Sequence, residues 1–391
     1  METAPVLLFP KSTGLINLGN TCFLNACIQT LVHLPELRTA MMSNECMRLV
    51  NAVETRFDES LVEVEAAATD IQEGLESAID NATVYLELLQ LGDLLVSAAK
   101  QSRVENRPLA VSPKRFVHTV QGVAQTMGRE LFTGWAQNDM PEFMMFVVEC
   151  LHNAAKRPVN IVIHGQAMND MDVMATQCYN MLRRVYDSEF SEVMQLLYGM
   201  LVSELRSVDD NPSVVHAVNP EQFFMIDLPV VSLDTNVPCT SLIECFRQFT
   251  RVELMNGANA WFHAESGKAI SVNKRIMFWQ FPPVLVITLK RFTPDGRHKH
   301  GHQIVFPVDG LDLSQFVVGY NPQRFVYDLV AVCNHVGGIQ GGHYTTFARG
   351  PSPADPWVHY NDSTVTMVGA QSSHIITPMA YCLVYRQRRA I

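Results

Sequence analysis

Residues 14–25 read GLINLGNTCFLN, a polar turn that leads into an apolar segment with Cys22 at the boundary. The apolar residues that follow recur at helical spacing before Pro35 ends the pattern: Leu24, Ile28, Leu31 and Val32. A helix that begins near Cys22 is therefore predicted. Unpaired N–H groups and the positive end of the helix dipole favour thiolate over thiol at such a position. Cys22 is thus a candidate nucleophile; the alternative is a buried cysteine that serves as a small apolar residue.

A second segment, far along the chain, supplies a possible base. Residues 341–347 read GGHYTTF, and residues 357–362 read WVHYND after a turn rich in proline and glycine. Their alternation predicts a hairpin that makes His343 and Asn361 cross-strand neighbours. A cysteine nucleophile needs a base to take its proton, and the base needs a third group to orient its ring. Cysteine, histidine and asparagine can supply these three roles.

With these segments the chain resembles the ubiquitin-specific proteases, the papain-like deubiquitinating enzymes. Four blocks occur in the order of that family: residues 14–25, 137–143 (QNDMPEF), 283–292 (PVLVITLKRF) and 341–362. The resemblance extends from Gly14 to Tyr385, nearly the whole chain. It implies an α+β, papain-like cysteine protease fold, with a helical thumb, a β-rich palm and β-fingers.

This resemblance also implies the domain organisation. Residues 1–391 form a single catalytic domain. The thumb with the nucleophile covers about residues 12–160, the fingers about 185–275, and the palm with the catalytic histidine about 276–390.

The resemblance further implies a role for each site residue. Cys22 attacks the carbonyl of the C-terminal glycine of ubiquitin, and His343 acts as the base. The family pattern favours Asn361 over the adjacent Asp362 as the residue that orients His343, and only one of the two can face it along a strand. Asp362 then assists through the oxyanion network or a water. Asn17 matches the oxyanion-hole side chain, although without the resemblance it reads as an ordinary turn asparagine.

Four residues are implied to contact the substrate: Gln137, Asp139, Glu142 and Tyr344. In the family, the matches to Asp139 and Glu142 contact two arginines in the ubiquitin tail. The D-x-x-E pattern of these two residues is equally typical of a helix cap, and one carboxylate can do both.

The sequence predicts no metal and no cofactor. The family usually carries four zinc cysteines in its fingers, but residues 206–210 (RSVDD) and 261–265 (WFHAE) contain none. The alternating His298, His300 and His302 invite a metal interpretation. Because Arg297 and Lys299 flank them, a solvated loop is preferred, and the resemblance implies that this loop lies near the tail-binding cleft.

Secondary structure is expected as follows. The acidic stretch from Glu45 to Asp93 is helix-patterned and should pack on the helix of Cys22, with an apolar stripe at Leu61, Val64, Ala68, Ile71 and Leu75. A helix beginning near Asp139 should bury Phe143, Val147, Cys150 and Leu151. Strands are predicted at residues 193–202 and 222–228, and a helix at 241–249.

Composition fits an intracellular globular enzyme, in the cytoplasm or the nucleus. The chain has 391 residues, 48% of them hydrophobic, and nine cysteines at irregular spacing, which favours a reducing compartment over a disulfide framework. No secretory signal or apolar run long enough to cross a membrane is recognised. The net charge of −10 argues against nucleic acid and suits a basic ligand, although moderate acidity also simply aids solubility.

The predicted function is therefore thiol-dependent hydrolysis of isopeptide and peptide bonds at the C-terminal glycine of ubiquitin, with ubiquitin and ubiquitinated proteins as partners. Two alternatives remain open. One is an inactive ubiquitin-binding protein of the same fold, and the other is a protease for a ubiquitin-like modifier.

Overall fold

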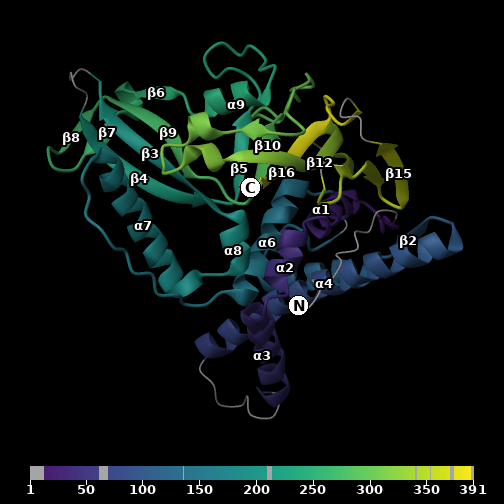
Figure 1. Ribbon diagram of the computed structural model, residues 1–391. Helices are drawn as coiled ribbons and strands as arrows, with labels where there is room; N and C mark the ends of the chain where they lie inside the picture. Colours follow the sequence, from purple (N-terminus) through teal and green to yellow (C-terminus); the bar gives the residue numbers. More distant parts are fainter. Residues whose placement is uncertain are drawn as a thin grey trace.

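A computed structural model of the chain describes residues 13–60, 69–134, 136–208, 214–339, 341–352, 354–369 and 374–388. Helices gather on one side of the molecule and β-sheets on the other (Figure 1). The fold is the expected mixture of helix and sheet. The predicted apolar stripe falls within residues 61–75, whose side chains lie outside the described part of the chain.

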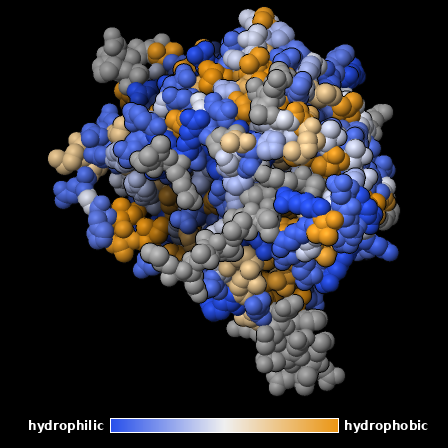
Figure 2. Space-filling view, turned by 45° about the vertical axis from the view of Figure 1, so that its right-hand side comes forward, coloured by the Kyte–Doolittle hydropathy of each residue, from blue (hydrophilic) through white to orange (hydrophobic). Residues whose placement is uncertain are grey.

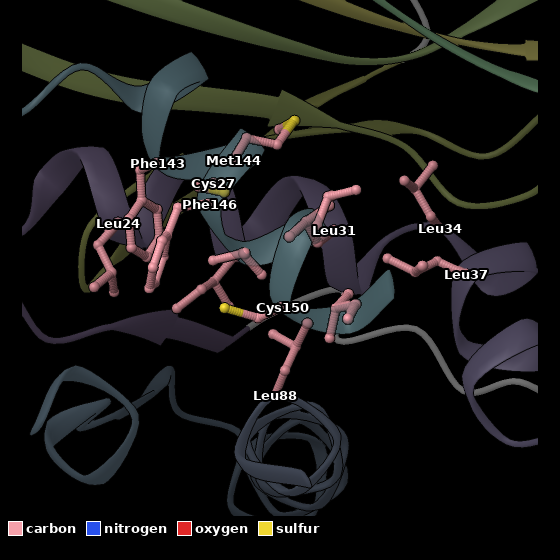
Figure 3. Packing of buried hydrophobic residues seen from close by; sticks show 14 of the residues in the cluster. Leu24, Cys27, Leu31, Leu34, Leu37, Leu88, Phe143, Met144, Phe146 and Cys150 are labelled. Carbon is pink, nitrogen blue, oxygen red and sulfur yellow. The ribbon is translucent and has the colours of Figure 1, made fainter. Parts of the chain in front are cut away.

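In the described residues, the helical half includes α1 (Cys22–Val32), α2 (Pro35–Met41), α3 (Asn44–Ser60), α4 (Thr69–Glu105), α5 (Lys114–Thr126) and α6 (Met140–Ala155). Helix α6 packs on α1, and α4 packs on α5 and α6. The acidic stretch was expected to pack directly on the helix of Cys22, but α6 takes most of that contact. Figure 3 shows Phe143 and Phe146 of α6 beside Leu24 of α1, with Cys150 toward Leu88 of α4.

The large sheet carries the second half of the predicted site. Its main strands run in the order β15 (Thr364–Gly369), β14 (Trp357–Asn361), β13 (Gly341–Ala348), β12 (Val326–Gly338), β16 (Ala380–Gln387), β10 (Val284–Lys290) and β5 (Met225–Pro229). Strand β11 (Leu311–Asp312) pairs with β12. Helix α1 packs against β13 and β12, so one hydrophobic core joins the helices to this sheet.

A four-stranded sheet extends to the left in Figure 1, in the order β4 (Val215–Phe223), β3 (Gly199–Ser207), β9 (Val272–Gln280) and β6 (Val252–Met255). Helix α7 (Asp170–Glu189) packs against β4. A small hairpin of β7 (Trp261–His263) and β8 (Lys268–Ile270) lies at the left end of this four-stranded sheet in Figure 1. These elements lie in the region where the resemblance predicts fingers.

Two strand predictions were wrong in detail. Residues 192–197 form a helix, α8 (Glu192–Leu197), because Ser191 at its N-cap accepts a hydrogen bond from the Met194 N–H; the strand starts only at Gly199. The segment 222–228 belongs to two strands in different sheets, since β4 ends at Phe223 and β5 begins at Met225. The helix predicted at 241–249 is confirmed as α9 (Leu242–Phe249), capped by Ser241.

The helix predicted near Asp139 is also confirmed. Helix α6 begins at Met140, and its predicted apolar face is buried at Phe143, Val147, Cys150 and Leu151. Aromatic contacts reinforce this packing, because the Phe23 and Phe143 rings meet edge to face with centroids 5.3 Å apart.

Helix α4 contains an apolar segment of membrane-spanning length, which was not recognised in the sequence. Its residues Glu76–Glu105 are long and apolar enough to cross a membrane by length and composition. In the structure, however, this helix packs against α5 and α6, and Glu87 forms an ion pair with Arg115 at 2.6 Å. Packing in the core accounts for part of its apolar residues, such as Leu88 and Leu95, whereas Leu94 is 57% exposed. On the face shown in Figure 2, hydrophobic residues lie in separate small groups among hydrophilic ones.

A short parallel pair anchors the chain just before the Cys22 turn. Strand β1 (Thr13–Leu15) pairs with β2 (Leu109–Val111), and the Leu15 N–H donates to the Asp362 carbonyl at 2.9 Å. Gly14 allows this approach, because a Cβ there would lie 2.5 Å from the Asp362 carbonyl oxygen. The turn between β14 and β15 is thereby held against the start of the chain.

Replacing Gly14 by alanine should therefore destabilise the fold. We expect Gly14→Ala to lower the free energy of unfolding by about 1–3 kcal/mol, because the backbone around Asp362 must move to admit the methyl group. Gly122→Ala is the matched control. No atom lies within 4 Å of a Cβ at this position in α5, so the change should stabilise by about 0.5–1 kcal/mol. Thermal denaturation of both variants measures the difference; equal midpoints would contradict the close contact.

Candidate active site

The turn before Cys22 is folded around the side chain of Asn17. The Oδ1 atom of Asn17 accepts hydrogen bonds from the Gly19 N–H at 2.9 Å and from the Thr21 N–H at 3.2 Å. Gly19 and Asn20 take positive φ angles of 104° and 57°, which glycine and asparagine tolerate best. This turn ends at Cys22, the first residue of α1. The predicted position of Cys22 at a helix N-terminus is confirmed.

The electrostatic environment of Cys22 differs from the expectation. The residue is only 3% exposed, and burial raises the pKa of its thiol; the negative charge of Asp362 raises it further. The backbone N–H of Tyr344 donates to the sulfur and partly opposes this rise. The helix terminus was expected to favour thiolate, but desolvation outweighs it. A neighbouring base is therefore needed to remove the proton.

The packing of α1 on β13 brings His343 to Cys22. The Thr346 hydroxyl of β13 donates to the Ala26 carbonyl of α1 at 3.0 Å. Closer to the helix terminus, Tyr344, the residue after His343, donates its backbone N–H to the Cys22 sulfur. The helix that begins at Cys22 thus packs on the strand that carries His343, although 321 positions separate these two residues in the sequence.

His343 in turn contacts Asn361. Its Nε2 atom lies 2.7 Å from the Asn361 Oδ1 atom. In the register of β13 and β14, Thr346 pairs with Tyr360, so His343 and Asn361 are diagonal rather than direct cross-strand neighbours. With Oδ1 as acceptor, the Nε2 atom carries the proton, and the Nδ1 atom remains free to accept one.

Asp362 belongs to a different set of contacts. Its carboxylate accepts hydrogen bonds from the Asn17 Nδ2 at 2.9 Å and the Asn25 Nδ2 at 2.8 Å. Its φ angle of 49° turns the chain after β14, which separates it from the face of Asn361. Asn25 is 2% exposed and was not assigned a role from the sequence, although it lies three residues after Cys22 and therefore about one helical turn along.

Asp139 occupies the N-cap position of α6 without capping it through its side chain. Instead, its two carboxylate oxygens accept hydrogen bonds from the Tyr344 and Tyr381 hydroxyls, each at 2.9 Å. Burial raises the pKa of Asp139, the two tyrosines oppose the rise, and the charge of Asp227 adds to it. The capping interpretation is thus wrong for the Asp139 side chain. Tyr381 was not singled out from the sequence.

The other two predicted substrate residues of this block, Gln137 and Glu142, stand before and after Asp139 in the sequence. Glu142 is exposed in the first turn of α6, and partial burial followed by the charge of Asp139 raises its pKa. Gln137 accepts a hydrogen bond from the Gly342 N–H at 2.6 Å through its Oε1 atom. The block at 137–143 therefore touches the segment that carries His343.

The described part of the chain contains no group of three or more His, Cys, Asp or Glu side chains placed to hold a metal ion. His302 contacts the Val230 carbonyl at 2.9 Å through Nε2. The Trp261 ring of strand β7 lies 5.6 Å from the ring of His216 in β4 and 5.3 Å from that of His263 in β7, measured between centroids. All nine cysteines are free and buried.

Comparison with known proteins places this geometry in a family. The sequence profile of the family described as Ubiquitin carboxyl-terminal hydrolase matches residues 13–385. Human "Ubiquitin carboxyl-terminal hydrolase 2" is 28% identical over 375 residues, which cover 95% of this chain and 54% of that protein. Human "Ubiquitin carboxyl-terminal hydrolase 3" is 26% identical over 395 residues, covering 97% of this chain and 68% of that protein. The chain thus spans about half the length of the first relative, at 54%.

A solved structure gives independent support for the fold. The "SAGA DUB module" with Ubp8, "bound to monoubiquitin", aligns with a TM-score of 0.59 at 18% identity and covers 100% of this chain and 72% of that one. At this identity the likeness concerns the fold alone. Together with the family match from residue 13 to residue 385, it shows that the chain belongs to the ubiquitin carboxyl-terminal hydrolase family.

Proposed function

We propose that this chain is a cysteine-type deubiquitinase that hydrolyses isopeptide and peptide bonds at the C-terminal glycine of ubiquitin. The observation that carries the proposal is the packing of α1, which begins at Cys22, on β13, which carries His343, together with the 2.7 Å contact of His343 with Asn361. Family membership supports ubiquitin as the substrate. The nine free cysteines support a reducing compartment, the cytoplasm or the nucleus.

In the proposed mechanism, Cys22 rests as a thiol, because burial raises its pKa. The free Nδ1 atom of His343 takes the thiol proton as the sulfur attacks the glycine carbonyl carbon. Asn361 keeps its hydrogen bond to Nε2 and stabilises the tautomer that leaves Nδ1 available. His343 then gives its proton to the leaving amine, and a thioester forms between Cys22 and ubiquitin. Water, deprotonated by His343, hydrolyses this thioester and releases free ubiquitin.

The negative oxygen that forms during attack needs donors. The start of α1 offers backbone N–H groups, and Asn17 offers its amide. One hydrogen of the Asn17 amide is donated to Asp362, which leaves the second one free. Asp362 and Asn25 therefore hold the orientation of the oxyanion donor, while Asn361 holds the orientation of the base.

The first test is covalent labelling. A ubiquitin probe with an electrophile at its C-terminus should form one adduct, at Cys22, and Cys22→Ser should abolish it. Cys239→Ser is the matched control, because Cys239 is 5% exposed and Cys22 3%, yet Cys239 lies outside the site. Mass spectrometry of the intact protein reads the result. Absence of any adduct would support an inactive binding protein, and labelling only by a ubiquitin-like probe would support a protease for that modifier.

The two adjacent residues Asn361 and Asp362 should have separable effects on turnover. Asn361→Ala should lower kcat about 100-fold, because the His343 ring loses its orientation. Asp362→Ala should lower kcat less than Asn17→Ala does, because Asn17 would still be held by its bonds to Gly19 and Thr21. Steady-state kinetics on a fluorogenic ubiquitin substrate measures both. Loss of turnover in Asp362→Ala with normal turnover in Asn361→Ala would reverse the assignment.

Asp139 should make substrate binding depend on pH. Its raised pKa means that the carboxylate takes up a proton at a higher pH than an ordinary aspartate does, and its attraction for a basic ubiquitin tail is lost as the pH falls. KM should rise on acidification in the wild type. In Asp139→Asn, KM at neutral pH should be about 10–100-fold higher than in the wild type, and it should not change with pH.

Glu149→Gln serves as the control for this prediction, since Glu149 lies further along the same helix α6, outside the predicted substrate contacts, and its side chain is 50% exposed. We expect it to change KM only slightly. A wild-type KM that does not vary with pH, together with a normal KM in Asp139→Asn, would show that Asp139 only supports Tyr344 and Tyr381.

A further inference from the structure

The amino group of Lys299 is held by the strands that lead to His343. It donates to the Nδ1 atom of His335 at 2.9 Å, to the His335 carbonyl at 2.8 Å and to the Gly337 carbonyl at 3.1 Å. An ammonium group has three N–H donors, so these contacts use all of them. The nitrogen also lies 5.4 Å from the centre of the Phe292 ring. Lys299 thus connects the loop after β10 to the end of β12.

His335, the main partner of Lys299, is a buried and neutral imidazole. It is 4% exposed, and burial followed by the charge of Lys299 lowers its pKa to about 4. Because an ammonium can only donate, Nδ1 of His335 is the acceptor and Nε2 carries the proton. Lys299 therefore fixes both the tautomer and the ring orientation of His335.

The His335 ring supports the residues on both sides of His343. It stacks on the Tyr344 ring with centroids 4.5 Å apart and an interplanar angle of 28°. On the other side, a Cβ built on Gly342 would lie 2.3 Å from the His335 Nε2 atom, so the backbone of Gly342 rests directly on the imidazole. A rotation of His335 would displace Gly342 and Tyr344 together, and His343 lies between them.

The hairpin between β12 and β13 is rich in glycine where the two strands end. Gly337 and Gly341 have positive φ angles of 119° and 153°, and Val336 and Ile339 near the tip are exposed. Glycine-rich backbone loses much conformational entropy when it is ordered, so a fixed hairpin needs an external anchor. Lys299 supplies one by binding the carbonyls of His335 and Gly337.

We propose that Lys299 and His335 form a positioning pair that sets the place of His343 relative to Cys22. Neither residue touches the reacting atoms; Lys299 orients His335, and His335 supports the backbone that carries the base. This inference rests on the proposed function and assigns to that same site two residues that the mechanism does not otherwise use.

The test compares Lys299→Met with Arg297→Met in the full chain. Arg297 lies in the same loop, its side chain is 81% exposed, and its nearest carboxylate is Asp295 at 3.8 Å. We expect Lys299→Met to lower kcat at least about tenfold with KM within threefold, because a small displacement of the base affects the chemical step most. Arg297→Met should stay within twofold in both. A kcat of Lys299→Met within twofold of the wild type would overturn the proposal.

A double-mutant cycle with His335→Phe shows whether the two residues act together. Phenylalanine keeps a ring against Tyr344 but removes the acceptor for Lys299. If the pair is one unit, the double variant should be no slower than Lys299→Met alone, within twofold. Multiplied losses would overturn the pairing. If Lys299→Met does not fold, His335→Phe decides alone: kcat lowered at least fivefold supports the proposal, and kcat within twofold overturns it.

The pH profile adds a readout that a purely structural effect would not move. Without Lys299, one cause of the lowered His335 pKa is gone, so His335 should gain a proton at a higher pH, and the acidic limb of kcat should shift upward. This shift should vanish in the double variant, which lacks the imidazole. The other titratable side chains against His335, Tyr344 and Tyr381, stay protonated, because burial raises both pKa values. Two results would overturn the link between Lys299 and His335. One is an acidic limb of kcat that does not shift in Lys299→Met, and the other is an equal shift in the double variant.

Alkylation of Cys22 by iodoacetamide at neutral pH separates this proposal from the proposed function, because it needs no ubiquitin. Slower alkylation of Cys22 in Lys299→Met than in Arg297→Met supports the positioning pair even if the protein does not hydrolyse ubiquitin substrates. Equal alkylation rates in the two variants overturn the positioning pair even if the protein does hydrolyse them.

Discussion

The packing of helix α1 on strand β13 is the contact on which the site depends. It joins the helical half of the molecule to the large sheet, and it places the first residue of the helix beside the strand that carries His343. The contact is held by a continuous apolar core and by the hydrogen bond from Thr346 to the Ala26 carbonyl. Because protein cores are packed as tightly as crystals, a shift in this interface moves the sulfur and the imidazole relative to each other.

The buried position of Cys22 disfavours its thiolate. A helix terminus stabilises a thiolate only where the charge keeps some solvation, and Cys22 is almost fully buried, with the Asp362 carboxylate close enough to disfavour a second negative charge. The protein thus separates two tasks between neighbouring residues. Asn361 contacts the His343 ring, which acts as the base in the proposed mechanism, while Asp362 accepts hydrogen bonds from Asn17 and Asn25 and raises the thiol pKa.

The helices and strands that carry the site residues could be predicted from the sequence. The contacts between these elements could be predicted only in part. Helical spacing located α1 and α6, and strand alternation located β13 and β14, because each pattern reflects which face of an element is buried. The helix α8 was mistaken for a strand, since six residues carry too little periodicity and the cap at Ser191 was overlooked. The double role of Asp139 as acceptor for two tyrosines, and the contacts of Asn25, Lys299 and His335, come from tertiary packing and leave no periodic signal.

In the proposed mechanism, His343, and not the helix terminus, makes Cys22 reactive. The most direct measurement is the rate of Cys22 alkylation by iodoacetamide from acidic to alkaline pH, in the wild type and in His343→Gln. We expect substantial alkylation of the wild type at neutral pH, and in His343→Gln a reaction that appears only at alkaline pH, where the buried thiol ionises by itself. Coincident profiles for the two proteins would contradict it.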